Sequence, residues 1–147
     1  MPVGAGLASA RHNANPGDNN YQLSSIGKII KQQWQDIPNH YNDVQLDEYV
    51  IMPNHIHGII VINQTRLRAD ARPAPTISQI ICSFKSRSSV EYIRYIKRNN
   101  LNFSGKIWQR SFYDHVIRNE RSLNAIRDYI ADNPNNWEQD IEHLLDL

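Results

Sequence analysis

The chain has 147 residues, of which 40% are hydrophobic and 21% charged, and these values are typical of one soluble globular domain with its own core. Its longest apolar run, residues 59–62, is far too short to span a bilayer, so we expect no membrane partner. The first residues lack the charged and apolar segments of a signal peptide. A single cysteine excludes an internal disulfide and suits a reducing compartment, which favours the cytoplasm.

The net charge of +1 does not by itself indicate a nucleic-acid-binding protein, but the charges are unevenly distributed. Between residues 66 and 118 the chain carries eleven Lys and Arg against three Asp and Glu, whereas acidic residues gather near 43–48 and 138–146. A basic middle segment can contact phosphates without a high overall isoelectric point. The solvated face of a helix explains the same charges equally well.

The first half of the chain predicts a helix and a hairpin. Residues 1–20 are rich in Gly, Ala, Asn and Pro without periodicity, and we interpret them as a flexible leader. Apolar residues at helical spacing predict a helix over 26–37, capped by Ser24 or Ser25 and stopped by Pro38. Residues 44–52 and 55–62 are rich in β-formers and flank Pro53-Asn54, which predicts an antiparallel hairpin.

The second half predicts two helices around a third strand. Thr76 can cap a helix that extends through residue 96, residues 112–117 alternate like a strand, and a last helix follows from about residue 122 to Pro134. This order predicts an α+β fold with a ferredoxin-like antiparallel sheet, helices on one face and a C-terminal helix that bears a tyrosine. No convincing first strand precedes the first helix. We divide the chain into the leader (1–20), one domain (21–137) and a short C-terminal tail (138–147).

A His-x-His pattern opens the second predicted strand. Because residues two apart on a strand point to the same face, His55 and His57 can offer two imidazoles to one metal while Ile56 turns into the core. Two imidazoles and an oxygen ligand suit a divalent ion that polarises a phosphate. On this pattern alone, two ordinary polar-face histidines are the more frequent outcome.

Tyr129 occupies an apolar-periodic position of the last predicted helix, so a core tyrosine is the default interpretation. A phenol with a pKa of about 10 needs a polarised phosphate to act as a nucleophile at neutral pH. Asn133 follows one helical turn later on the same face, and its amide oxygen can complete a site with two histidines. As a residue that ends a helix before proline, Asn133 needs no function.

The segment 106–115 mixes basic and aromatic residues, a pattern that suits single-stranded nucleic acid, where bases stack on rings and cations hold phosphates. The aromatic residues of this segment are equally well explained as core. We take the following as candidate DNA contacts: Lys85, Arg87, Lys106, Trp108, Gln109, Arg110 and Arg118.

Four segments in a fixed order resemble the IS200-like Y1 transposases of the HUH superfamily, and within them the REP-associated tyrosine transposases most. The similarity extends over about residues 26–137 and is carried by residues 46–58 (LDEYVIMPNHIHG), 84–86 (FKS), 107–118 (IWQRSFYDHVIR) and 129–134 (YIADNP). The family's opening strand has no counterpart here: residues 2–11 look instead like a Gly/Ala/Arg-rich loop that some relatives carry after the second strand.

The resemblance implies a ferredoxin-like fold with Tyr129 as nucleophile and with His55, His57 and Asn133 as ligands of Mg²⁺ or Mn²⁺. It implies a DNA-recombining endonuclease and strand transferase that acts near the nucleoid on single-stranded or hairpin DNA through a 5′-phosphotyrosine bond. It also allows a homodimer, in which the tyrosine helix is donated in cis or in trans.

Three other functions stay open at this point. An inactive, truncated remnant would bind DNA with little cleavage, because loss of a central strand exposes core. A metal-dependent hydrolase would use His55 and His57 with Tyr129 in the core, and would form no covalent DNA adduct. A plain α+β interaction domain would have no catalytic activity.

Overall fold

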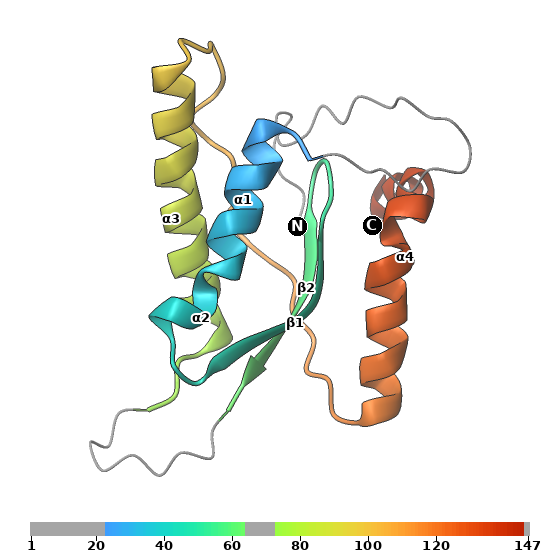
Figure 1. The fold of residues 1–147 in the computed structure, drawn as a ribbon. Coiled ribbons are helices and arrows are strands. Elements are labelled where there is room, and N and C mark those ends of the chain that lie inside the picture. The colour runs from blue at the N-terminus through green and yellow to red at the C-terminus, as the bar shows by residue number, and fades with distance from the viewer. Residues whose placement is uncertain (1–22, 64–72, 146–147) are drawn as a thin grey trace.

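The computed structural model describes residues 23–63 and 73–145, and beyond Pro134 only the backbone. The elements follow in the order α1 (Ser25–Gln35), α2 (Ile37–His40), β1 (Val44–Ile51), β2 (Ile56–Ile62), α3 (Ile77–Arg98) and α4 (Glu120–Leu145). The predicted leader, residues 1–20, lies outside the described residues. The chain is an α+β protein in which a β-hairpin stands between α1 and α3 on one side and α4 on the other (Figure 1). The predicted fold class, with its antiparallel sheet and C-terminal helix, is confirmed.

Helix α1 begins where the sequence predicts. Ser24 is the N-cap, and its hydroxyl accepts a hydrogen bond from the backbone N–H of Gly27 at 3.0 Å. Ile26, Ile30 and Trp34 are buried along one face, at the spacing of a helix that packs on a core. The helix ends at Gln35, and Pro38 lies within the short helix α2 that follows.

Strands β1 and β2 form an antiparallel two-stranded sheet whose turn is closed by a hydrogen bond from Met52 N to His55 O (2.8 Å). The register is regular at both ends but shifts between Leu46 and Tyr49 of β1. Leu46 pairs with Ile60 and Tyr49 with Gly58, so two residues of β1 stand opposite one residue of β2. This is a β-bulge, a feature that bends a strand and redirects a side chain.

Helix α3 carries the other half of the core. Thr76 and Gln79 form a capping box at its start, as the sequence predicts for Thr76. Ile80, Ile81 and Phe84 are buried with α1, and the Phe84 ring lies edge-on to that of Trp34, 5.2 Å between centroids. Helices α1 and α3 thus cover one face of the hairpin (Figure 1).

The predicted third strand is not formed. Residues 112–117 take no regular secondary structure, and the described part of the chain holds a single sheet, β1–β2. Tyr113 is 89% exposed and Val116 65%, and of this segment Phe112 packs against the core at its start. Alternation alone does not make a strand, because the backbone groups of a strand also need a partner edge.

Helix α4 extends further than the sequence predicts. Asn119 Oδ1 accepts a hydrogen bond from Ser122 N at 2.8 Å, and the helix then continues through Pro134 to Leu145. The expectation that Pro134 ends the helix at Asn133 is therefore wrong. A proline removes one backbone hydrogen bond, which kinks a helix more often than it terminates one when the flanking turns remain bonded. None of the described helices is long and apolar enough to cross a membrane.

Candidate active site

One face of the hairpin packs on the core, and the opposite face carries the candidate site residues. Ile56 and Gly58 of β2 point toward α1, where a Cβ added to Gly58 would lie only 2.4 Å from Trp34 Cζ2. His55 and His57 alternate with them and therefore point to the opposite face, toward α4. The indole of Trp34 fills the place of a side chain at position 58, and this packing fixes which face the histidines occupy.

His55 is held by the turn that precedes it. The residue is 2% exposed, and its Nδ1 lies 2.6 Å from Asn54 Oδ1. Because an amide oxygen only accepts, Nδ1 is the donor in this bond, and in the neutral ring the lone pair then belongs to Nε2. This is the tautomer that a metal-binding histidine adopts when a neighbour fixes its other nitrogen.

The two histidine rings and Tyr129 form a contiguous aromatic row. The rings of His55 and His57 lie 4.6 Å apart between centroids at an interplanar angle of 76°. The rings of His57 and Tyr129 lie 5.4 Å apart, also at 76°. Tyr129 is 49% exposed, so its phenol stands at the boundary between the hairpin face and solvent rather than in the core.

Asn133 is buried one turn beyond Tyr129. It is 2% exposed, and neither its amide oxygen nor its amide nitrogen has a hydrogen-bond partner among the described residues. Helix α4 runs beside the hairpin with its C-terminal end toward the β1–β2 turn (Figure 1). Tyr129 to Asn133 rises about 6 Å along the helix, and His57 to His55 about 7 Å along the strand, in the same direction. Asn133 thus lies further toward the β1–β2 turn than Tyr129, as His55 does compared with His57.

This donor set fits a divalent ion. The described residues contain no group of three or more His, Cys, Asp or Glu that could hold a metal, so two imidazoles need a ligand of another kind. An amide oxygen such as that of Asn133 has the chemistry of such a ligand, and a buried amide without partners among the described residues carries an energetic penalty that coordination would relieve.

Helix α4 is attached to the hairpin by an ion pair that the sequence did not reveal. Arg127 Nε donates to Asp47 Oδ1 (2.9 Å) and Arg127 Nη2 to Asp47 Oδ2 (2.6 Å). The hydrogen bonds from Arg127, and a further one from the Glu48 backbone N–H, lower the pKa of the Asp47 carboxyl. The two residues are 80 positions apart, and no local pattern connects them.

Two of the predicted DNA contacts have structural roles in this fold. Trp108 is 8% exposed and donates from Nε1 to the buried Ser88 Oγ at 2.8 Å, so it anchors the segment after α3 to the core. It offers no ring face for base stacking, and we correct that assignment. Lys85 donates from Nζ to the carbonyls of Gln109 (2.9 Å) and Ser111 (3.0 Å), and burial lowers its pKa. It shapes the segment that carries the other candidates.

The remaining candidates differ in exposure. Arg87 donates from Nη1 to Ser83 Oγ at 2.6 Å, while its Nε and Nη2 are buried without a hydrogen-bond partner among the described residues. Four candidates stand exposed between α3 and α4, where a nucleic acid can reach them: Lys106, Gln109, Arg110 and Arg118.

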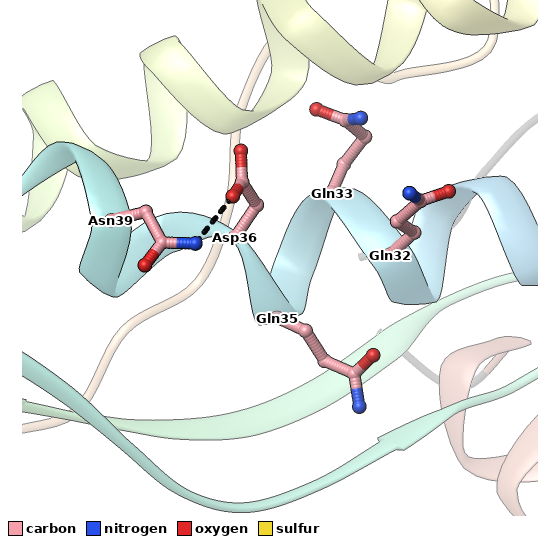
Figure 2. A pocket seen from close by; sticks show the side chains of 5 residues that line it. All are labelled: Gln32, Gln33, Gln35, Asp36 and Asn39. Carbon is pink, nitrogen blue, oxygen red and sulfur yellow. Dashed lines mark hydrogen bonds between the residues drawn. The ribbon is translucent and has the colours of Figure 1, made fainter.

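A shallow hollow of about 300 Å³ is lined by polar residues of the α1–α2 region. Figure 2 shows its polar lining and the 2.7 Å hydrogen bond from Asn39 Nδ2 to Asp36 Oδ1. The pKa of Asp36 is lowered by hydrogen bonds with Asn39 and His40, and less by the Arg87 charge. None of the residues that line the hollow is a tyrosine or a histidine, so we do not place the active site there. Its lining residues are Gln32, Gln33, Gln35, Asp36 and Asn39.

Comparison with known proteins places the chain in a family. The family model "Transposase IS200 like" matches residues 19–133, and the chain belongs to this family. An uncharacterized protein of Haemophilus influenzae is 41% identical over 128 residues, which cover 81% of this chain and 70% of that protein. A second protein of the same organism, named as a REP-associated tyrosine transposase, is 30% identical over 84 residues, 57% of this chain and 46% of its own length. No solved structure matches the chain.

Proposed function

We propose that this protein cuts and rejoins single-stranded DNA, with Tyr129 as the nucleophile and a divalent ion, Mg²⁺ or Mn²⁺, held by His55, His57 and Asn133. The observation that carries the proposal is the contact between the Tyr129 and His57 rings on the face of the hairpin that also bears His55. Membership of the IS200-like transposase family supports a DNA substrate.

The surroundings of each proposed ligand favour its role in binding a metal. The side-chain carbonyl of Asn54 fixes the tautomer of His55, and Gly58 and Trp34 fix the face that His57 occupies. Asn133 presents a buried amide that has no hydrogen-bond partner in the described part of the chain. When bound, the ion supplies positive charge that polarises a phosphate and stabilises the charge that develops there.

Tyr129 performs the covalent step. Its phenolic oxygen attacks the phosphorus, a Tyr129 Oη–P bond forms and the P–O3′ bond breaks. The phenol loses its proton, and the departing 3′ oxygen takes one up, which leaves a 5′-phosphotyrosine and a free 3′-hydroxyl. Attack by a 3′-hydroxyl reverses these steps and joins strands without ATP, because the phosphodiester energy is kept in the covalent bond.

The exposed residues between α3 and α4 offer a route for the DNA. Lys106, Gln109 and Arg110 precede α4 on a segment that Lys85 and Trp108 fasten to α3. Cations that neutralise phosphates make binding sensitive to salt, so affinity for single-stranded or hairpin DNA is expected to fall as salt rises. Tyr129 lies beside a histidine of its own chain, which supports action in cis; a homodimer stays a prediction.

The test is a cleavage assay on end-labelled single-stranded DNA hairpins with Mn²⁺, resolved on a denaturing gel. Wild-type protein is expected to give a protein–DNA adduct, Tyr129→Phe none, and Tyr113→Phe as much as wild type. Tyr113 is the matched control because it is an exposed tyrosine and phenylalanine keeps its ring. If the wild-type protein binds DNA but forms no adduct, the proposed catalysis is wrong and an inactive DNA-binding protein is favoured. If Tyr129→Phe still forms an adduct, Tyr129 is not the nucleophile.

A further inference from the structure

We propose that Asp47 and Arg127 are positioning residues that set the rotation of α4 about its axis and thereby hold Tyr129 beside His57. The inference rests on the proposed function of Tyr129. All three guanidinium nitrogens of Arg127 are engaged: Nε and Nη2 by the Asp47 carboxylate, and Nη1 by Asn124 Oδ1 at 3.0 Å. A two-bonded arginine–carboxylate pair of this kind constrains orientation as well as distance.

The β-bulge supplies the carboxylate. Asp47 and Glu48 together stand opposite a single residue of β2, between the pairs Leu46–Ile60 and Tyr49–Gly58. The extra residue lets Leu46 and Tyr49 both pack against the α1 side of the core although they are three positions apart. Asp47 is thus turned toward α4, where its Oδ1 also accepts the Glu48 backbone N–H at 2.7 Å. The orientation of the carboxylate is therefore also fixed by a hydrogen bond within β1, independently of Arg127.

Arg127 and Tyr129 flank the buried face of α4. At about 100° per residue, Ile130 lies between them around the helix, and Ile130 is a buried apolar residue of α4, which packs against β1. One edge of this face is bound to Asp47, and the other edge carries the nucleophile. An apolar contact alone resists separation but resists rotation little, since it has no direction.

The consequence for the reaction follows from the geometry of a helix. A side-chain tip about 5–6 Å from the axis moves by about 2 Å when the helix turns by about 20°. A misplacement of about 1 Å can cost about 100-fold in rate when a nucleophile must meet its target in line. An ion pair that is still partly exposed, like this one, contributes modestly to overall stability, so its removal is expected to affect reactivity much more than folding.

Two measurements on the full-length protein test this proposal. The first is the rate constant of adduct formation at saturating hairpin DNA, beside the Kd for the same DNA measured in the Tyr129→Phe background. Asp47→Asn is expected to slow adduct formation by about ten-fold or more while Kd changes little. Exchange of the charges, Asp47→Arg with Arg127→Asp, is expected to restore part of the rate. The matched control is Glu91→Gln, which breaks an ion pair with Arg94 on α3, away from α4.

The second measurement does not depend on catalysis. With Cys82→Ser as background, spin labels at the exposed Ala125 of α4 and Lys28 of α1 report the position of α4 by pulsed electron–electron distance measurement. Asp47→Asn is expected to broaden the distance distribution, and Glu91→Gln to leave it narrow. If wild type forms no adduct but Asp47→Asn still broadens the distance distribution, the positioning of α4 is upheld and only the proposed function is wrong. Unchanged distances and rates in Asp47→Asn overturn this inference, and Arg127→Gln provides the same test if Asp47→Asn does not fold.

Discussion

The ring of Tyr129 on α4 meets the ring of His57 on β2 edge-on, 5.4 Å between centroids, and His57 meets His55 in the same manner at 4.6 Å. Three side chains from two elements, 74 positions apart at the extremes, thus line one face of the hairpin. A phenol and two imidazoles in contact have the chemistry that our proposal requires, a nucleophile beside candidate ligands for a divalent ion.

His57→Ala is expected to abolish specific Mn²⁺ binding and adduct formation together. Loss of a group that merely orients a ligand costs about 10–100-fold in metal affinity, so loss of a ligand is expected to cost at least about 100-fold. Titration calorimetry with Mn²⁺ measures the affinity. His115→Ala is the control, because His115 is an exposed histidine on the segment before α4. If wild type and His57→Ala bind Mn²⁺ with equal affinity, His57 is not a metal ligand.

Gly58→Ala is expected to destabilise the protein by about 1–3 kcal/mol, since a Cβ at this position meets the rigid indole of Trp34. The control is Gly105→Ala, where an added Cβ has no atom within 4 Å and the effect is expected to stay within about 0.5 kcal/mol. Urea denaturation measures both. Trp34→Leu removes the indole that the added Cβ would meet. If Gly58→Ala lowers the free energy of unfolding less in the Trp34→Leu background than in wild type, the strain lies between the Cβ and the indole.

Much of this architecture follows from local patterns. The two-residue period of a strand is enough to place His55 and His57 on one face, and helical spacing is enough to bury Ile26, Ile30 and Trp34. The capping residue Thr76 is equally local, because its partner lies three residues on. In each case the interaction that decides the structure connects residues within about two helical turns, where sequence spacing and spatial proximity agree.

What escaped prediction depends on distant partners. The burial of Trp108 requires the hydroxyl of Ser88, itself buried on α3, to accept the indole N–H. The attachment of α4 requires a bulge that turns Asp47 toward Arg127, and neither residue stands out in its own segment. Residues 112–117 show the opposite failure: the local pattern of a strand is present, but the described residues bring no partner edge beside it.

Acid is expected to weaken the attachment of α4 in a defined range. The pKa of Asp47 is held below its ordinary value of 3.8 by the hydrogen bonds from Arg127 and the Glu48 N–H. A carboxyl with a lowered pKa in the folded state contributes stability that is fully present above 3.8 and is lost as pH falls through the folded value. Glu48 and Glu120 also face Arg127, and their charges act in the same sense on its pKa.

The measurement is urea denaturation of wild type and Asp47→Asn from pH 6 down to pH values below the folded pKa of Asp47. The stability difference between the two proteins is expected to be constant above about pH 5 and to shrink toward zero in acid, where wild-type Asp47 is protonated as well. A difference that persists unchanged into acid would show that Asp47 acts through its shape alone and not through its charge.

Replacement of Asn133 separates the requirements of folding from those of the metal. Both amide atoms of Asn133 are buried without a partner among the described residues, and a buried unsatisfied polar group costs about 1–3 kcal/mol. Asn133→Leu has a similar branched shape and no polar atoms, so the metal-free protein is expected to be as stable as wild type or more stable.

The expected effect of Mn²⁺ has the opposite sign. A ligand at 100 times its Kd stabilises a folded protein by about 2.7 kcal/mol, and wild type is expected to show a rise in Tm of corresponding size. Asn133→Leu is expected to lose this rise along with adduct formation, whereas Asn102→Leu, at an exposed asparagine of the segment after α3, keeps both. A variant that is destabilised without metal would show that Asn133 has a structural partner. One that still responds fully to Mn²⁺ would exclude its amide from the metal site, because removal of a ligand cannot leave the affinity unchanged.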